Sequence, residues 1–157
     1  MGNKRSQIEM SEEEIQAFLE EERVAIVTSF GPRGWPHSMP LWYQVVDGRI
    51  RSWTFRKSQK VKNLERDPRA TVLVEAGYDV YPELRGVMYE AETVIHDDSE
   101  TVLDYGLGSI GRYSPGGGEP DEAMIEAFRA QAAKRVVLEF VPVHTVTWDH
   151  RKLGGVY

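Results

Sequence analysis

Residues 54–68, "TFRKSQKVKNLERDP", combine hydroxyl and basic side chains in a pattern suited to binding an anion. Positions 49–69 hold eight Lys or Arg against two acids, whereas the whole chain has a formal net charge of -6. A local positive field in an acidic protein suits a compact anionic ligand, because the remaining surface would repel a long polyanion. The alternative is a solvated helix face, which is what charge runs commonly form.

This segment predicts a short helix whose first turn can hold a phosphate. Ser58 is a candidate N-cap and Pro68 a stop, which gives a helix at about 59–66. Free amide groups and the helix dipole both favour negative charge at a helix N-terminus. Lys60 lies in that first turn, and Thr54 adds a hydroxyl as the chain leaves the preceding strand. We therefore predict a phosphate-type anion site at this corner.

Helical spacing assigns the other side chains of the segment to faces. Val61 and Leu64 form the buried edge, which turns Lys62 toward solvent. Asn63 follows Lys60 by three positions, so the two side chains are expected to share a face.

The flanking sequence is typical of antiparallel strands joined by turns. Ser11 and Glu14 make a capping-box pattern at the start of a predicted helix at about 11–22. Pro36 and Pro40 interrupt an apolar run, which must therefore lie at a sheet edge or carry a bulge.

A hairpin is predicted at Asp47-Gly48, followed by a strand with two different faces. One face carries Arg51, Trp53 and Phe55, and the other carries Ile50, Ser52 and Thr54. Further along, the glycines of 106–118 weaken a helical pattern, and we interpret that segment as a mobile loop rather than a functional lid.

Strands in hairpin order with a few inserted helices predict one domain over 1–157, mainly β with helices. We expect a small barrel of about six antiparallel strands plus three to four helices. A Rossmann fold or a P-loop is excluded, because neither GxGxxG after a first strand nor Gly-Lys-Ser/Thr occurs. The expected parts are an N-terminal helix (11–22), the main barrel strands (23–95) with a phosphate-binding corner (54–63), a helical insertion (98–133) and C-terminal strands (135–149).

Composition limits the remaining chemistry. There is no cysteine, so neither a thiolate metal site nor a disulfide is possible, and a cytoplasmic location is expected. No apolar run resembles a signal peptide or a membrane span. The four histidines form no close ligand pair, so we predict no metal site, with an axial haem ligand as a minor alternative. They are His37, His96, His144 and His150.

Thr54-x-x-x-Ser58-x-Lys60, after a "DG" hairpin and before "NLERDPRATVLVE", resembles the pyridoxamine phosphate oxidase-like, FMN-binding split β-barrel superfamily. "ERVAIVTSFGPRGWPHSMPLWY" is similar to the first two barrel strands of that family, and "VTWDHRKL" to its C-terminal end. The resemblance implies that the corner grips the phosphate of FMN or a deazaflavin. It also implies a homodimer, because the family places its cofactor at a subunit interface.

One departure separates the branches of this superfamily. The oxidases proper carry an Arg and a Lys where this chain has Ser38 and Tyr43 in "SMPLWY", so oxidation of a vitamin B6 phosphate is not expected. "HSMPLWY" instead resembles the flavin/deazaflavin oxidoreductases, especially the branch that uses coenzyme F-420. A single phosphate does not need the additional positive charges of Arg56, Lys57 and Lys62. These charges suit the longer anionic tail of coenzyme F-420.

The resemblance implies a hydride transfer from the reduced deazaflavin to a small organic acceptor such as an activated double bond. It assigns no catalytic side chain; Tyr43, Tyr113, His144 and solvent all stay open as proton donors. Trp53 and Trp148 are either walls of the cofactor site or core residues. The implied cofactor-binding residues are Ser38, Met39, Pro40, Leu41, Trp53, Thr54, Arg56, Lys57, Ser58, Lys60, Asn63 and Trp148.

Other classes of function stay open. An FMN-dependent oxidoreductase or a non-catalytic flavin-binding protein would have the same corner. A nucleic-acid binder could use the basic run beside Trp53 and Phe55, but the sequence pI of about 5.3 counts against it. The sequence alone does not identify the substrate.

Overall fold

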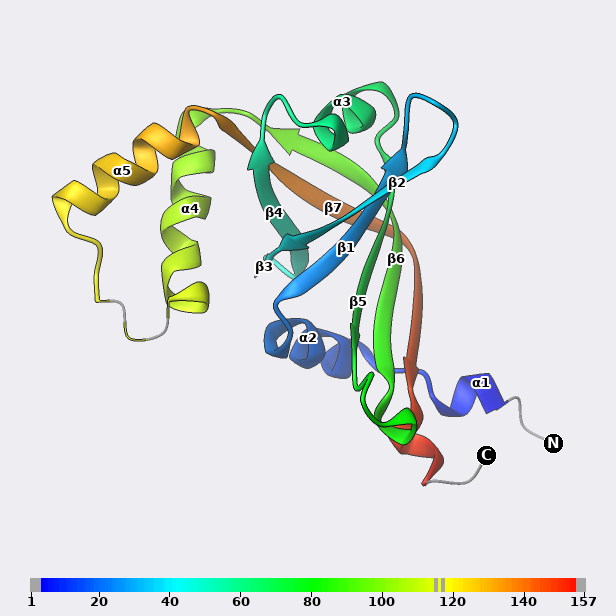
Figure 1. The fold of residues 1–157 in the computed structure, drawn as a ribbon. Helices are drawn as coiled ribbons and strands as arrows, with labels where there is room; N and C mark the ends of the chain where they lie inside the picture. Colours follow the sequence, from blue (N-terminus) through cyan, green and yellow to red (C-terminus); the bar gives the residue numbers. More distant parts are fainter. Residues whose placement is uncertain (1–3, 115, 117, 155–157) are drawn as a thin grey trace.

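The computed structural model describes residues 4–114, 116 and 118–154, which form one curled sheet and a set of covering helices (Figure 1). The strands are β1 (Val24–Phe30), β2 (Pro36–Trp42), β3 (Gln44–Val46), β4 (Arg49–Phe55), β5 (Arg69–Ala76), β6 (Arg85–His96) and β7 (Arg135–Asp149). The helices are α1 (Lys4–Gln7), α2 (Glu12–Glu21), α3 (Gln59–Arg66), α4 (Ser99–Tyr113) and α5 (Glu122–Ala132). Two 3-10 turns, η1 (Tyr81–Glu83) and η2 (His150–Leu153), complete the description.

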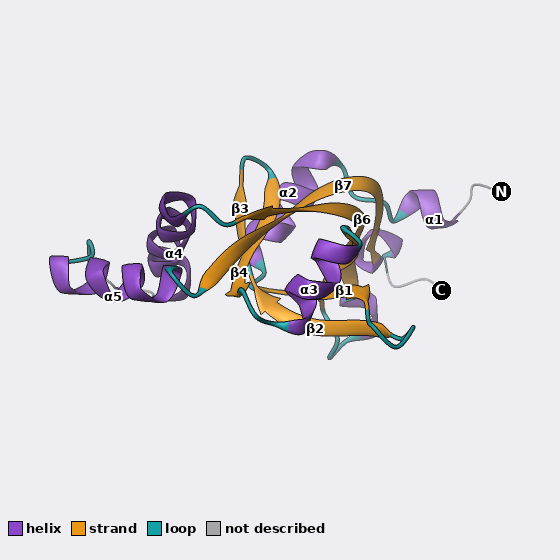
Figure 2. Cartoon of the chain, turned by 90° about the horizontal axis from the view of Figure 1, so that it is seen from above, coloured by secondary structure: helices purple, strands orange, loops and turns teal. Residues whose placement is uncertain are grey.

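All seven strands pair antiparallel in the order β2-β1-β5-β6-β7-β4-β3. The sheet curls until its two ends approach each other, as the view from above shows (Figure 2). There the Ser52 hydroxyl donates to the Trp42 carbonyl at 2.8 Å and bridges β4 to β2, which no ladder of backbone bonds joins. The fold is therefore a split β-barrel, mainly β with helices, as predicted; the described residues hold seven strands and five α-helices rather than about six and three to four.

The main hydrophobic core fills the interior of the barrel, and α2 closes one end of it. Ile15, Phe18 and Leu19 point inward from α2 and are buried. The predicted capping box is present, because the Ser11 hydroxyl accepts from the Glu14 amide and the Glu14 carboxylate accepts from the Ser11 amide. The largest fully buried side chains at the centre include Tyr43, Phe140, Ile50 and Leu138.

The two faces of β4 differ as the sequence predicts. Asp47 and Gly48 have φ values of 52° and 75°, so they form a tight hairpin turn between β3 and β4. Ile50, Ser52 and Thr54 are buried on the barrel side. The outer side carries Arg51, Trp53 and Phe55. This alternation places a hydroxyl, Thr54, at the inner end of the strand that leads into α3.

Strand β2 lies at one edge of the sheet, which confirms the expectation from its two prolines. It pairs with β1 only, so its other edge makes no backbone hydrogen bonds to a strand. Pro36 and Pro40, which lack an N–H donor, are tolerated in such a strand. Five of its seven residues are exposed and two are half-buried. The strand predicted to run along a cofactor is therefore an open edge.

Helices α4 and α5 form a pair that projects from one side of the barrel (Figures 1 and 2). The predicted loop at 106–118 is wrong over its first part, because α4 continues to Tyr113. A Cβ on Gly106 would lie 2.7 Å from the Trp53 ring, so this glycine lets the helix pack closely on β4. Positions 115 and 117 of the predicted loop lie outside the described residues, and the mobility of this segment stays a prediction.

Candidate functional site

The corner between β4 and α3 contains three of the predicted anion-binding groups, Thr54, Ser58 and Lys60. Thr54 is 5% exposed, and β4 is held by its pairing with β7, where Thr54 faces Val136. The chain turns directly after β4, with the Ser58 amide donating to the Phe55 carbonyl at 3.0 Å. These bonds fix the Thr54 hydroxyl and the start of α3 at one end of the barrel.

Lys60 points back from α3 toward β4. Val61 and Leu64 are buried against the barrel and set the rotation of the helix. The Lys60 ammonium donates to the Thr54 hydroxyl at 3.2 Å, and no carboxylate among the described residues forms an ion pair with it. Burial lowers the pKa of Lys60 from its ordinary value, because desolvation penalises the charged form. A bound anion would restore the missing counter-charge.

Ser58 occupies the N-cap position of α3 without capping it through its side chain. The caps of α2, α4 and α5, in contrast, are Ser11, Asp98 and Asp121, and each accepts a bond from the first turn of its helix. The Ser58 hydroxyl is buried and has no partner in the described part of the chain. The first turn of α3 contains no acidic residue. This helix start therefore has free donors, the positive charge of Lys60 with no acid beside it, and the positive end of the helix dipole.

Asn63 does not join Lys60 at the corner. Its side chain is 0% exposed and its amide donates to the Ser29 hydroxyl of β1 at 3.1 Å. Its carbonyl oxygen accepts from the Gln59 amide at 2.8 Å. Asn63 therefore fastens α3 to the barrel, and its predicted role as a ligand contact stays a prediction.

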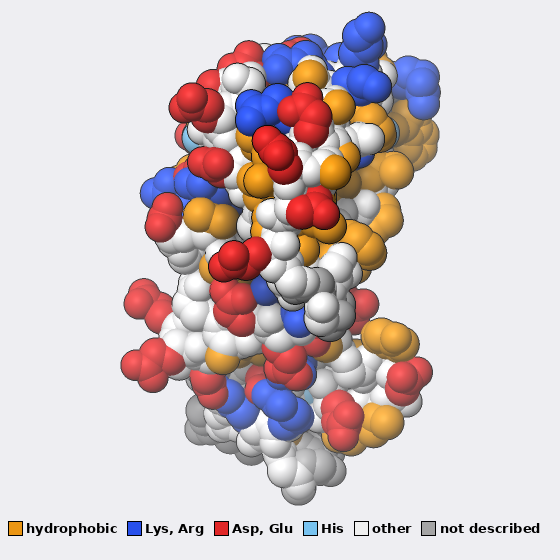
Figure 3. All heavy atoms as spheres, turned by 90° about the vertical axis from the view of Figure 1, so that its left-hand side faces the viewer, with side chains coloured by type: hydrophobic (Ala, Val, Ile, Leu, Met, Phe, Trp, Pro, Cys, Tyr) orange, Lys and Arg blue, Asp and Glu red, His pale blue; other side chains and the backbone are white. Residues whose placement is uncertain are grey.

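The other basic residues of the segment divide into paired and free groups. Arg56 bonds to the Asp97 carboxylate and carbonyl, at 3.3 and 3.2 Å. Lys57 and Lys62 are exposed, and no ion pair in the described residues includes either. Figure 3 shows Lys and Arg side chains gathered at the top of the molecule, the end where Figure 1 places α3. The positive field predicted from the sequence is therefore concentrated around the corner.

On β2, Ser38, Met39 and Pro40 are exposed and Leu41 is half-buried. The Ser38 hydroxyl forms a hydrogen bond of 2.8 Å with the Thr28 hydroxyl on β1. The backbone groups on the free edge of β2 have no strand partner. They can pair with the polar rim of a planar ligand lying along the strand.

Neither predicted tryptophan wall stands at the corner. The Trp53 ring packs against Tyr105 of α4 and Phe128 of α5, with centroids 6.2 and 6.1 Å away. Trp148 lies near one end of β7, whereas Val136, which faces Thr54, lies near the other end. The Trp148 ring packs on Gly86, where a Cβ would come within 2.3 Å of it. Both tryptophans therefore have packing contacts in this chain, and their role as walls of the cofactor site stays a prediction.

Arg135 is a neighbour of the corner that the sequence analysis missed. Its guanidinium lies 4.2 Å from the centre of the Phe55 ring and 4.6 Å from that of Trp53. Burial lowers the pKa of Arg135. The pairing of Phe55 with Arg135 joins strands 80 positions apart, so no local sequence signal could have indicated it.

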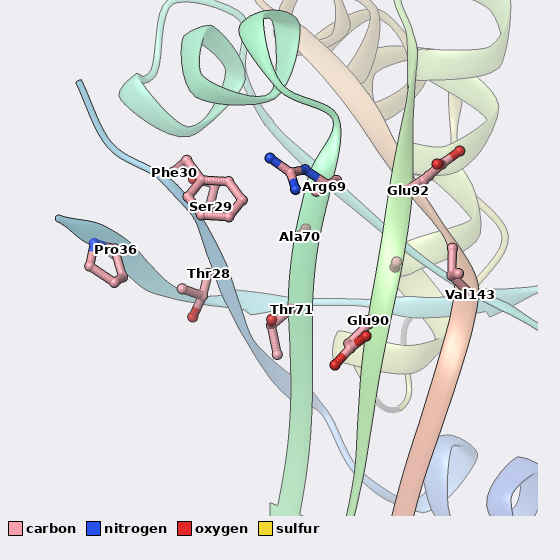
Figure 4. Close-up of a pocket in the computed structure, with 11 residues that line it drawn as sticks. Thr28, Ser29, Phe30, Pro36, Arg69, Ala70, Thr71, Glu90, Glu92 and Val143 are labelled. Carbon is pink, nitrogen blue, oxygen red and sulfur yellow. The ribbon is translucent and has the colours of Figure 1, made fainter. Parts of the chain in front are cut away.

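A separate groove of about 450 Å³ lies on the outer face of β1, β5, β6 and β7 (Figure 4). Phe30, Thr71 and Val143 line it together with Arg69 and Glu92. Arg69 is neutralised by Asp67 at 2.7 Å. None of the three corner groups lines this groove, so it is not part of the anion site.

The split barrel with a basic strand-to-helix corner defines a class of flavin-type binding folds, and the comparisons agree with this assignment. Residues 11–149 match the family described as pyridoxamine 5'-phosphate oxidase. The chain belongs to this family. A comparison with curated proteins finds no match.

Solved structures extend the comparison. A conserved hypothetical protein from Mycobacterium tuberculosis is 38% identical, with a TM-score of 0.88, and 98% of this chain and 93% of that chain are covered. An F-420 reductase is 22% identical, with a TM-score of 0.61, covering 83% and 94% of the two chains. A FAD-binding protein from Mesorhizobium loti is 15% identical, with a TM-score of 0.63, covering 88% and 92%. At these lower identities the likeness shows the fold alone.

No helix among the described residues is long and apolar enough to cross a membrane. No three His, Asp or Glu side chains there are grouped as a metal site would require.

Proposed function

We propose that the corner of Thr54, Ser58 and Lys60 binds the phosphate of a flavin-type cofactor, and that the protein is an oxidoreductase using reduced coenzyme F-420. The observation that carries the proposal is the Lys60 ammonium, which bonds to Thr54 at 3.2 Å beside the partnerless, buried hydroxyl of Ser58. A phosphate oxygen would accept from all three groups at once and remove the cost of burying the ammonium. These residues therefore fit the group that the family implies.

The preference for coenzyme F-420 over FMN is supported by charge. The oxidases of the family carry an Arg and a Lys at the positions of Ser38 and Tyr43, and neither residue here offers a positive group. Tyr43 is 0% exposed and its hydroxyl donates to the Leu19 carbonyl at 2.7 Å. Within the basic segment, Lys57 and Lys62 are exposed and in no ion pair of the described residues, and a longer anion that extends from the corner can reach them. One structural neighbour is itself called an F-420 reductase, which supports this branch.

When bound, the reduced deazaflavin supplies a hydride to an activated double bond or similar acceptor. The residues of the chain position and shield this chemistry. Thr54, Ser58 and Lys60 fix the phosphate, and the free edge of β2 from Met39 to Leu41 aligns the ring. No side chain is assigned as a proton donor. Tyr113 is held by the backbone of Tyr43 and Arg23, which removes it from the open candidates.

We also propose that the protein acts as a homodimer formed through the outer face of β1 and β2. Val24, Ile26 and Trp42 are 42%, 38% and 63% exposed on that face. They lie on the same face as the groove beside Phe30, which Arg69 and Glu92 also line, so a second copy would cover apolar side chains together with charged ones. A second copy would also cover the open side of β2 and exclude water from the ring.

Turnover is tested by mixing the protein with reduced coenzyme F-420 and a panel of activated alkenes, nitro compounds and quinones. Oxidation of the coenzyme that needs both protein and acceptor, and that falls in Lys60→Ala, is the expected result. Tight binding without turnover across the panel would contradict the enzyme and favour a cofactor-binding protein. Turnover with FMN alone would move the protein to the FMN-dependent branch.

A further inference from the structure

A small hollow of about 90 Å³ lies beside the corner, between the β1–β2 turn and the start of α3. Its lining consists of Gly31, Pro32, Arg33, Trp35, Pro36, His37 and Gln59. No acid is among these residues, and two of them, Arg33 and His37, carry nitrogen donors that can bind an anion. A site for one water molecule needs about 10–15 Å³ of this kind of volume, so the space admits a carboxylate or phosphate group.

Two side chains around the hollow, those of His37 and Arg33, offer polar groups without a partner in the described chain. The Nδ1 atom of His37 is buried and no group in the described chain bonds to it. Arg33 is exposed at the tip of the turn, and no ion pair within the described residues includes it. A buried ring nitrogen without a partner is costly, and a ligand atom bound in the hollow would remove that cost.

The turn that carries these residues has a defined shape. The Gly31 amide donates to the Trp35 carbonyl at 3.0 Å, and a Cβ on Gly31 would lie 2.5 Å from that oxygen. Only glycine permits this close approach. His37 then follows at the start of β2, paired with Ser29, whose hydroxyl is bound to Asn63 of α3. The turn and α3 are thus fixed relative to each other.

The hollow and the corner share the first turn of α3. Gln59 lines the hollow, and its two sequence neighbours, Ser58 and Lys60, belong to the corner. Successive helical residues project about 100° apart, so the two sites lie on adjoining sides of one helix start. A ligand whose phosphate rests at the corner can therefore place a second charged group in the hollow.

We propose that this hollow is a second anion subsite, in which Arg33 and His37 bind a further phosphate or carboxylate of the ligand held at the corner. This inference rests on the proposed function, which it deepens by defining the cofactor class. A ligand with a single phosphate fills only the corner, whereas one with two anionic groups uses both subsites. Arg33 and His37 are thereby the residues that select between these ligands.

The test is isothermal titration calorimetry of the protein with FMN, FAD and coenzyme F-420, all at the same ionic strength. FMN has one phosphate, FAD a diphosphate, and coenzyme F-420 a phosphodiester with carboxylates. Arg33→Ala and His37→Gln are expected to weaken FAD or coenzyme F-420 about three- to tenfold and to leave FMN within twofold. The affected ligand identifies the second group as phosphate or carboxylate. Arg129→Ala on the distant helix α5 is the control for loss of one positive charge.

The outcomes separate this inference from the function itself. If Lys60→Ala weakens every ligand but Arg33→Ala and His37→Gln change none, the corner stands and the second subsite is wrong. Equal weakening of FMN in Arg33→Ala would also overturn it, because the hollow would then serve the first phosphate. If the wild-type protein binds none of the three ligands, the proposed function fails first. Arg33 lies in an exposed turn, so its variant keeps the test valid if His37→Gln unfolds.

Discussion

The Lys60 ammonium lies 3.2 Å from the Thr54 hydroxyl, with no carboxylate of the described chain forming an ion pair with it. Two adjacent elements, the end of β4 and the start of α3, thus hold a partly desolvated positive charge in place before any ligand arrives. Such a charge costs free energy in the free protein and gains it on binding an anion. Removing this charge should therefore stabilise the ligand-free protein and weaken its binding of an anion.

Lys60→Met is expected to raise the melting temperature of the ligand-free protein at neutral pH while it weakens ligand binding. Burial depresses the pKa of Lys60 below its ordinary value of 10.5, so the charged form destabilises the folded state at every pH below that depressed pKa. The cost disappears as the pH rises through the depressed pKa to 10.5. Thermal unfolding at pH 7 and pH 10 measures it, with Lys62→Met as the exposed control. A lower melting temperature for Lys60→Met at pH 7 would contradict this account.

Ser58→Ala is expected to affect binding more than stability. The hydroxyl makes no capping bond and has no described partner, so its removal should leave the free energy of unfolding nearly unchanged. Loss of an N-cap hydroxyl that does bond ordinarily costs about 1 kcal/mol, and Ser11→Ala in α2 provides that comparison. Urea unfolding of both variants distinguishes them. Equal destabilisation would mean that Ser58 is a structural cap.

Glu139→Gln is expected to destabilise the protein by about 2 kcal/mol without altering ligand binding. The Glu139 carboxylate, 4% exposed, bonds to Arg49 at 2.6 Å, Arg51 at 2.8 Å and His96 at 2.8 Å. Burial alone would raise its pKa, but the bonds from Arg49 and His96 and the charge of Arg51 hold it below the usual value. This contribution is complete above the unfolded pKa of 4.5 and is lost as the pH falls through the lowered pKa.

The measurement is urea unfolding of Glu139→Gln and the wild type at pH 7 and pH 4. The difference between the two proteins should shrink at the lower pH. A constant difference would show that the substituted amide disturbs packing instead of charge.

Ile26→Glu is expected to dissociate the proposed homodimer, because it places a charge in an apolar contact without touching the core. Ile26 is 38% exposed on the outer face of β1. Sedimentation velocity of the variant and of the control Glu75→Gln, exposed on β5, measures the change. A monomeric wild-type protein would refute the dimer directly, and a dimeric Ile26→Glu would place the interface elsewhere.

Local signals in the sequence predict much of the fold. The capping box of Ser11 and Glu14 and the turn at Asp47-Gly48 each depend on neighbours a few positions away. The helix at 59–66 follows from the candidate N-cap and the proline that stops it, and its buried edge follows from helical periodicity. The capping box, the turn and this helix are all confirmed. The class of fold then follows from hairpin order.

The errors concern contacts between distant segments. Gly106 weakens a helix in isolation, yet here it allows close packing on Trp53, which is 53 positions away. The bond of Asn63 to Ser29, a residue on another strand, could not be predicted from helical spacing. Arg135 and His37 carry no local pattern that marks them as neighbours of the corner. Long-range pairing determines such environments, and helical or strand periodicity does not encode it.

The most direct test of the central claim is a fluorescence titration. Wild-type protein and Lys60→Ala are each titrated with coenzyme F-420 and with FMN at the same ionic strength. We expect micromolar or tighter binding of coenzyme F-420, weaker binding of FMN, and a loss of about 1.5–3 kcal/mol in Lys60→Ala. Lys62→Ala should lose less. Unchanged affinity in Lys60→Ala, or binding of neither ligand by the wild type, would contradict the assignment of this corner as the phosphate site.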